Sequence, residues 1–171
     1  VHLDVERHAA QRADAIAVRH RNSQLSYAEL NAKSNRLAHY LLNAGVGSET
    51  RVMACLDPHP DCVVALLAIM KSGATYVPVN PAHPRERINT IISDALPQLI
   101  LVNEAHQHLF SDFDRRVTVI ERLHGRLQEQ PDENPRTRIH PHQDATVFYT
   151  SGTTGKPCCC STVARCLMQR R

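Results

Sequence analysis

Short apolar runs rich in branched residues alternate along the chain with longer segments that have the periodicity of helices. Five of these runs are long enough to be strands of a sheet: RVMACL (51–56), TYVPV (75–79), QLILV (98–102), VTVI (117–120) and ATVFYT (145–150). Several are apolar almost throughout, which is typical of strands buried on both faces. Because strands and helices alternate, the sequence predicts an α/β fold, a mostly parallel sheet with helices on both faces.

The helical segments carry recognisable start and stop signals. Ser26 stands where a helix N-cap would, and Glu29 follows three positions later, which is the spacing of a capping box. Gly45 and Gly47 are the expected end of that helix. The other elements predicted from the sequence are two short strands over 15–20 and 24–27 and two helices over about 59–71 and 84–95.

A polar stretch with three prolines, residues 124–143, separates the fourth apolar run from the fifth. It has no apolar period, so we expect a long surface connection. The segment SGTTGKP (151–157) follows the fifth run directly. Ligands bind parallel sheets at the carboxyl ends of the strands, so this segment is placed where a ligand is expected.

Charge and hydropathy exclude several functional classes. The chain has 20 basic and 17 acidic residues, a net charge of +3, and only 4% aromatic residues. Because the basic residues are spread out and few aromatics accompany them, a nucleic-acid partner is not expected. The longest strongly apolar run, CVVALLAIM (62–70), is much shorter than the roughly 20 residues that cross a bilayer. We therefore expect no membrane partner and a cytoplasmic location.

The cysteines fall into two groups. Cys55 and Cys62 lie in apolar surroundings, which favours buried thiols with a structural role. The other four are in the last fourteen residues: Cys158, Cys159, Cys160 and Cys166. Three adjacent cysteines point in divergent directions, whereas zinc sites need spaced ligand pairs, so no metal site is predicted. Without a secretory signal, a disulfide framework is not expected either.

The segment around SGTTGKP has the chemistry of an anion-binding loop. Gly152 and Gly155 lack a Cβ and allow backbone N–H groups to converge on a phosphate. Hydroxyl groups and the Lys156 ammonium add further donors. The spacing differs from the common P-loop, in which a lysine is followed by Ser or Thr, because Pro157 follows here. The alternative is a Ser/Thr/Gly-rich surface turn.

Other polar residues admit a functional and a structural interpretation. Asp57 follows a buried strand and could line a cleft, or it could form a turn before Pro58. The histidines of HQH (106–108) and HPH (140–142) could ligate a metal, but solvated surface positions are the expected interpretation.

Three stretches together resemble the adenylate-forming enzymes, the superfamily of peptide synthetase adenylation domains, acyl-CoA synthetases and luciferases. YTSGTTGKP (149–157) is similar to the phosphate-binding signature of that superfamily. LSYAEL (25–30) and MKSGATYVPVNPAHPRERI (70–88) resemble two motifs of the peptide synthetase branch. The three motifs occur in family order at roughly family spacing, and the resemblance covers residues 1–157.

The resemblance implies that a carboxylic or amino acid is activated with ATP and Mg²⁺, giving an acyl-adenylate and pyrophosphate. The acyl group would then pass to the phosphopantetheine thiol of a carrier protein. The loop would hold the β- and γ-phosphates while the carboxylate attacks the α-phosphorus. Carried over residue by residue, the phosphate-binding positions are Thr150, Ser151, Gly152, Thr153, Thr154, Gly155 and Lys156. No catalytic residue is assigned, and neither is the acid that is activated.

The sequence departs from the family pattern after Pro157, where Cys158 and Cys159 stand in place of Lys-Gly. We therefore predict a partial AMP-binding domain over 1–157, the truncated N-terminal subdomain of an adenylate-forming enzyme, and a Cys/Arg-rich tail outside the family over 158–171. A frameshifted or mis-spliced gene end is our hypothesis for the change. Within the tail, residues 161–171 have the spacing of a short helix.

Three functions are compatible with these motifs. The first is an N-terminal fragment of an amino-acid adenylation enzyme, which we expect to be inactive alone. The second is a fragment of a fatty-acyl or aryl-CoA ligase. The third is a non-catalytic remnant or nucleotide-binding module. A sheet that ends after the loop would leave an unpaired apolar edge, so we also expect self-association.

Overall fold

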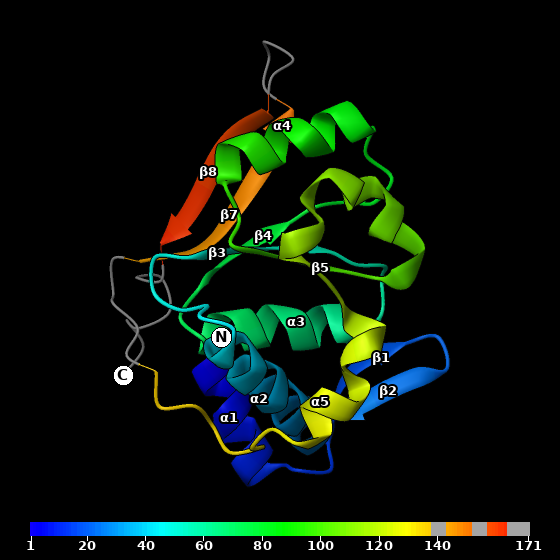
Figure 1. Ribbon diagram of the computed structural model, residues 1–171. Helices are drawn as coiled ribbons and strands as arrows, with labels where there is room; N and C mark the ends of the chain where they lie inside the picture. The colour runs from blue at the N-terminus through cyan, green and yellow to red at the C-terminus, as the bar shows by residue number, and fades with distance from the viewer. Residues whose placement is uncertain (138–142, 152–156, 164–171) are drawn as a thin grey trace.

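The computed structural model describes residues 1–137, 143–151 and 157–163, and Figure 1 shows them as a sheet between two helical layers. In chain order the elements are α1 (His2–Gln11), β1 (Ile16–His20), β2 (Ser23–Ser26), α2 (Tyr27–Asn43), β3 (Arg51–Cys55), α3 (Pro60–Lys71), β4 (Thr75–Pro78), α4 (Arg85–Ala95), β5 (Leu99–Val102), the 3-10 segment η1 (Glu104–Arg116), β6 (Val117–Val119), the 3-10 turn η2 (Ile120–Leu123), α5 (His124–Gln128), β7 (Asp144–Ser151) and β8 (Pro157–Val163).

Six strands form the main sheet in the order β6-β5-β3-β4-β7-β8. The pairs β3–β4, β3–β5, β4–β7 and β5–β6 are parallel, and β7 and β8 pair antiparallel. The strands β1 and β2 form a separate antiparallel hairpin. The predicted α/β fold with a mostly parallel sheet is therefore confirmed.

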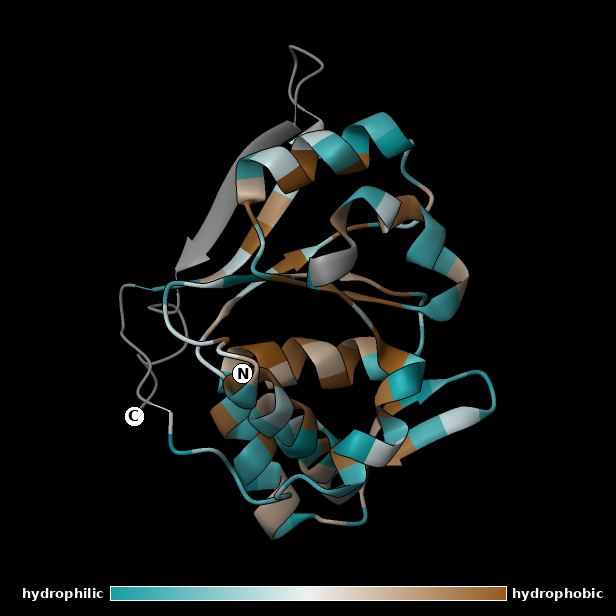
Figure 2. Ribbon diagram, in the orientation of Figure 1, coloured by the Kyte–Doolittle hydropathy of each residue, from teal (hydrophilic) through white to brown (hydrophobic). Residues whose placement is uncertain are grey.

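Each face of the sheet has its own apolar core. Along β5, Leu99 and Leu101 pack with α2 and α3, whereas Ile100 and Val102 pack with α4 and Phe110. This alternation follows from the period of two in a strand, and it explains why the β5 sequence is apolar at every position. Figure 2 shows the apolar sides of α3 and α4 turned toward the sheet from opposite directions.

Both ends of α2 match the signals in the sequence. The Ser26 hydroxyl accepts a hydrogen bond from the Glu29 backbone N–H, and the Glu29 carboxylate accepts one from the Ser26 backbone N–H, which completes the capping box. Gly45 has a φ of 80°, and the backbone N–H of Val46 reaches the Leu41 carbonyl at 2.9 Å. This left-handed glycine ends the helix as predicted, because a side chain would strain that conformation.

A buried lysine fastens the helices below the sheet to one another. The side chain of Lys71, at the end of α3, is only 1% exposed. Its ammonium donates at 2.8 Å to the Glu6 carboxylate on α1 and to the amide oxygens of Asn31 and Asn35 on α2, and at 3.2 Å to Asn134. Burial lowers the pKa of Lys71, and the hydrogen bond and charge of Glu6 oppose that shift.

Three segments differ from the expectations. The N-terminal residues form α1, for which no helix was predicted, and the stretch 124–143 begins with the short helix α5. Farther along, the stretch is exposed as expected of a surface connection, and the backbone carbonyls of Asp132 and Glu133 contact the Asn35 amide and the His39 ring of α2. Residues 157–163 are strand β8, so the predicted short helix is wrong for 161–163.

Among the helices in the described ranges, none has the length and apolar character needed to cross a membrane.

The Lys71→Ala variant should unfold at a lower urea concentration than the parent chain. The change leaves Glu6 and the Asn35 amide without their charged partner, and such losses cost about 3–5 kcal/mol in the free energy of unfolding. Lys33→Ala is the matched control, because Lys33 is exposed on α2 and surface changes stay within about 0.5 kcal/mol. Urea unfolding measures both variants. A loss below about 1 kcal/mol for Lys71→Ala would contradict the role given to this ammonium.

Candidate active site

Three parallel strands bring separate segments of the chain to the same edge of the sheet. Because β3, β4 and β7 run in one direction, their carboxyl ends at Cys55, Pro78 and Ser151 lie along that edge (Figure 1). The segment predicted to bind phosphate leaves the end of β7. This is the edge at which parallel sheets bind ligands.

A cleft of about 580 Å³ opens at this edge, on the side of the sheet that faces α3. Its wall contains Tyr76 and Pro78 of β4, Cys62 of α3 and Phe148 of β7. Phe148 is 48% exposed, which is unusual for a phenylalanine in a central position of a sheet. The lining is completed by Ala54, Leu56, Asp57, Pro58, Val79, Asn80, Pro81, Ala82 and His83. The cleft therefore offers an apolar wall with polar groups around it.

Two ionisable groups on the cleft wall, Tyr76 and Cys62, stay neutral at ordinary pH. Burial, followed by the effect of Cys62, raises the pKa of the Tyr76 phenol to about 12. Burial also raises the pKa of the Cys62 thiol, and the charges of Asp61 and Asp57 add to that shift. The thiol donates to the Asp57 carbonyl at 2.6 Å. A neutral apolar wall of this kind favours contact with a ring or an aliphatic chain over contact with a charge.

Asp57 lies at the rim of the cleft in a network of hydrogen bonds. The His106 ring Nε2 contacts the Asp57 carboxylate at 2.8 Å, and the backbone N–H of Asp57 donates to the Asn103 side-chain oxygen at 2.7 Å. Of the two interpretations left open by the sequence, cleft lining is the one observed. The His106 side chain is 21% exposed and keeps part of its contact with solvent, whereas HPH (140–142) lies outside the described residues.

The structure locates two of the seven predicted phosphate-binding residues. Thr150 is exposed in the last part of β7, opposite Cys158 of β8, and Ser151 ends β7 opposite Pro157. The other five lie outside the described residues: Gly152, Thr153, Thr154, Gly155 and Lys156. Their roles stay predictions. What the structure adds is that their segment joins two antiparallel strands at the cleft edge.

Sequence reasoning missed most of the cleft wall. Cys62 was expected to be a buried structural thiol, and neither Tyr76 nor Phe148 was singled out. The signal that could have found them is the alternation within β4 and β7, which places Tyr76, Pro78 and Phe148 on one face of the sheet near its carboxyl edge.

Within the described ranges, no group of three His, Cys, Asp or Glu side chains is arranged to hold a metal ion. A Mg²⁺ ion that arrives with a nucleotide is bound largely by phosphate oxygens and needs few protein ligands. The exposed Thr150 hydroxyl is a suitable oxygen donor at the cleft edge. Thr150 is thus one oxygen donor that a magnesium–nucleotide complex could use at this edge.

Helices cover both faces of the mostly parallel sheet, and a hydroxyl-rich sequence follows one strand at its carboxyl edge. These features are typical of α/β proteins that bind ligands at this edge. The profile of the AMP-binding enzyme family matches residues 5–168. The chain belongs to the AMP-binding enzyme family. The match extends past residue 157, and the predicted end of the family-like segment at that residue stays a prediction.

Two relatives have related sequences. The chain is 38% identical over 158 residues to malpinin synthetase of Mortierella alpina, which covers 92% of this chain and 2% of the relative. It is 39% identical over 160 residues to a dimodular nonribosomal peptide synthase of Bacillus subtilis (strain 168), which covers 89% of this chain and 7% of the relative. The chain thus spans a small part of these relatives.

Solved structures share the fold. The complex of VinN with 3-methylaspartate matches with a TM-score of 0.86 at 22% identity, over 95% of this chain and 47% of that one. A fatty acyl CoA synthetase of Mycobacterium tuberculosis matches with a TM-score of 0.82 at 18% identity, over 95% of this chain and 34% of that one. At these identities the likeness establishes the fold alone.

The raised pKa of Cys62 predicts the pH dependence of its alkylation. The thiolate is the reactive form, so the rate in the folded chain should still climb above pH 9.0, the ordinary pKa of a thiol. In the chain unfolded by urea, the rate at the same residue should level off near that pH. Iodoacetamide labelling with peptide-resolved mass spectrometry measures both. A folded-state rate that levels off at or below pH 9.0 would contradict the burial argument.

Proposed function

We propose that this chain is the phosphate-binding part of an ATP-dependent carboxylate-activating enzyme. In the reaction, a carboxylate oxygen of the substrate attacks the α-phosphorus of ATP, a new C–O–P linkage forms, and the bond to pyrophosphate breaks. An acyl-adenylate and pyrophosphate result. The acyl group then passes to the thiol of a carrier protein, which releases AMP. The proposal places this reaction in the cytoplasm.

The observation that carries the proposal is the position of the motif YTSGTTGKP. Its first part ends β7 at the carboxyl edge of the sheet, and its last residue, Pro157, begins β8. The two strands that flank the segment meet it at this edge of the sheet, which is where an ATP-binding loop is expected. The seven positions proposed to bind the phosphates are Thr150, Ser151, Gly152, Thr153, Thr154, Gly155 and Lys156.

ATP and Mg²⁺ are the cofactors that this proposal requires. Backbone N–H groups at the two glycines, together with the hydroxyls, would bind the β- and γ-phosphates. Mg²⁺ would neutralise part of the phosphate charge. The Thr150 hydroxyl is an oxygen that could coordinate the ion. The neutral wall of Tyr76, Pro78 and Phe148 would face an apolar or ring-shaped part of the bound molecules.

Amino acids are the proposed substrate class. The relatives with the related sequences are malpinin synthetase and a nonribosomal peptide synthase. One solved structure with the shared fold is a complex of VinN with L-aspartate. These names support an amino acid over other carboxylic acids, and a carrier protein as the acceptor of the acyl group.

Two other functions remain candidates. An acyl- or aryl-CoA ligase is supported by the fatty acyl CoA synthetase that shares the fold. A nucleotide-binding module without catalysis is supported by the phosphate-binding motif, whose two ends belong to β7 and β8. We propose that the 171 residues do not catalyse alone, because the site they contribute is one edge of one sheet.

MgATP should raise the melting temperature of the chain without turnover. At a concentration about 100 times its dissociation constant, a ligand stabilises by about 2.7 kcal/mol, which corresponds to about 5–10 °C here. The variant with Ser151, Thr153 and Thr154 all replaced by Ala should lose this shift, and Ser23→Ala, on the distant β2, should keep it. Thermal denaturation with and without MgATP measures the effect.

The same preparations should give no ATP–pyrophosphate exchange with any amino acid. Robust exchange would overturn the proposed inactivity of the chain alone. A melting temperature that MgATP leaves unchanged would overturn the phosphate-binding role itself. If MgATP still raises the melting temperature of the triple variant, the nucleotide binds somewhere other than the loop.

The outer edge of β8 supports the proposed self-association. Among the described residues, β8 pairs on one side only, with β7. Unpaired strand edges join to one another through backbone hydrogen bonds. Sedimentation velocity should show concentration-dependent association of the 171-residue chain, and Ser161→Pro in β8 should reduce it, because proline weakens strand pairing. Monomers at all concentrations would contradict this arrangement, and Ser111→Pro in η1 serves as the control for an added proline.

A further inference from the structure

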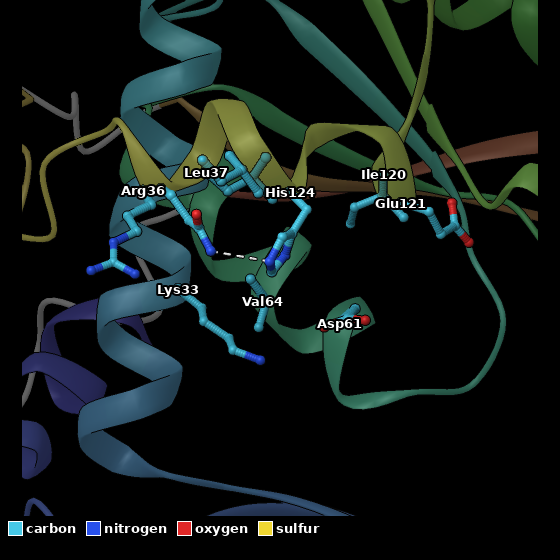
Figure 3. Close-up of a pocket in the computed structure, with 10 residues that line it drawn as sticks. Lys33, Arg36, Leu37, Asp61, Val64, Ile120, Glu121 and His124 are labelled. Atoms are coloured by element: carbon cyan, nitrogen blue, oxygen red, sulfur yellow. Dashed lines mark hydrogen bonds between the residues drawn. The ribbon is translucent and has the colours of Figure 1, made fainter.

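A second cavity, of about 290 Å³, lies between α2, α3 and the η2–α5 segment (Figure 3). Four aliphatic side chains form its apolar lining: Leu37, Val64, Ile120 and Leu127. Leu37 is fully buried and Val64 is 5% exposed, so most of the accessible apolar surface comes from the half-buried Ile120 and Leu127. The volume is near the lower limit for small-molecule sites, which suits a compact ligand with one apolar group.

Charges of both signs surround this apolar lining. Figure 3 shows Lys33 extending from α2 toward α3, where Asp61 lies, and Glu121 on the far side of the cavity. Lys33 makes no hydrogen bond or ion pair with the rest of the described chain, whereas the neighbouring Arg36 is paired with Asp132 at 3.0 Å. Lys33 is therefore the cation available to a ligand.

Glu121 and Asp61 are the acidic residues at the cavity. Glu121 accepts from the Asn103 amide at 2.8 Å and from the Glu104 backbone N–H at 3.0 Å, and both donors are neutral. Asp61 contacts the His59 ring at 2.9 Å and is half exposed. A ligand with both a cationic and an anionic group would thus find a partner for each, whereas an anion alone would face two carboxylates.

The cavity is separate from the cleft that adjoins the predicted phosphate loop. It adjoins η2, which follows β6 at one end of the sheet order, whereas the loop leaves β7 near the other end. The first turn of α3 lies between them, since Asp61 lines the cavity and Cys62 lines the cleft. Binding in the cavity is therefore a different event from binding at the cleft.

We propose that the α2–α3–α5 cavity is a binding site for a small zwitterion with an apolar side chain, of the class of the aliphatic α-amino acids. The side chain packs on Val64, Ile120 and Leu127. The carboxylate pairs with the Lys33 ammonium, and the ligand's ammonium faces Asp61. This assignment does not depend on whether the chain binds ATP.

Isothermal titration of the 171-residue chain with L-leucine tests the site. Lys33→Gln and Asp61→Asn should each weaken leucine binding at least tenfold, because each removes the partner of one ligand charge. Arg126→Gln is the matched control, since Arg126 is exposed on α5 and does not line the cavity, and it should change the affinity less than twofold. Circular dichroism checks that the variants fold like the parent chain.

Ligand analogues test the chemical class. N-acetyl-leucine lacks the cation, leucinamide lacks the carboxylate, and glycine lacks the apolar group, so each should bind at least tenfold more weakly than leucine. Leucine binding that Lys33→Gln and Asp61→Asn leave intact would overturn the location of the site. N-acetyl-leucine binding as tightly as leucine would overturn the zwitterion class, and undetectable leucine binding would overturn the site itself.

Discussion

The buried ammonium of Lys71 is the interaction on which the helical layer below the sheet depends. An ion held in a low-dielectric interior is tolerated only when its donors are satisfied, and here Glu6, Asn31, Asn35 and Asn134 accept from it. These partners come from three segments that are distant in sequence. The position of α3 under the sheet therefore fixes α1, α2 and the stretch after α5 together. In turn, α3 supplies one wall of each of the two cavities.

Much of the fold follows from local patterns in the sequence. The strands β3 and β5 are apolar at nearly every position because helices cover both faces of the sheet. The capping pair at Ser26 and the left-handed Gly45 mark the ends of α2 because backbone groups there must find partners. The helix α1 escaped prediction, since none of its residues is buried and no side chain caps its N-terminus. It is held by tertiary contacts such as Glu6 with Lys71.

The candidate site divides into a part that sequence reasoning reaches and a part that it does not. The glycines, hydroxyls and lysine of SGTTGKP are contiguous, so their chemistry can be interpreted without a structure. The cleft wall is assembled from Cys62, Tyr76 and Phe148, which belong to three different elements. Their proximity depends on strand order, and a sequence pattern specifies strand direction better than strand order. The same reason hides the contact between Asp57 and His106.

Asn103 joins the surroundings of the two cavities through a single amide. Its nitrogen donates to Glu121 beside one cavity, and its oxygen accepts from the backbone of Asp57 beside the other. If the Asn103 amide were rotated by 180°, its oxygen would face the Glu121 carboxylate and its N–H₂ group would face the Asp57 backbone N–H. The side chain thus has one setting in which both contacts form. This single orientation of the Asn103 amide therefore fixes the position of the η2 turn relative to the residues that follow β3.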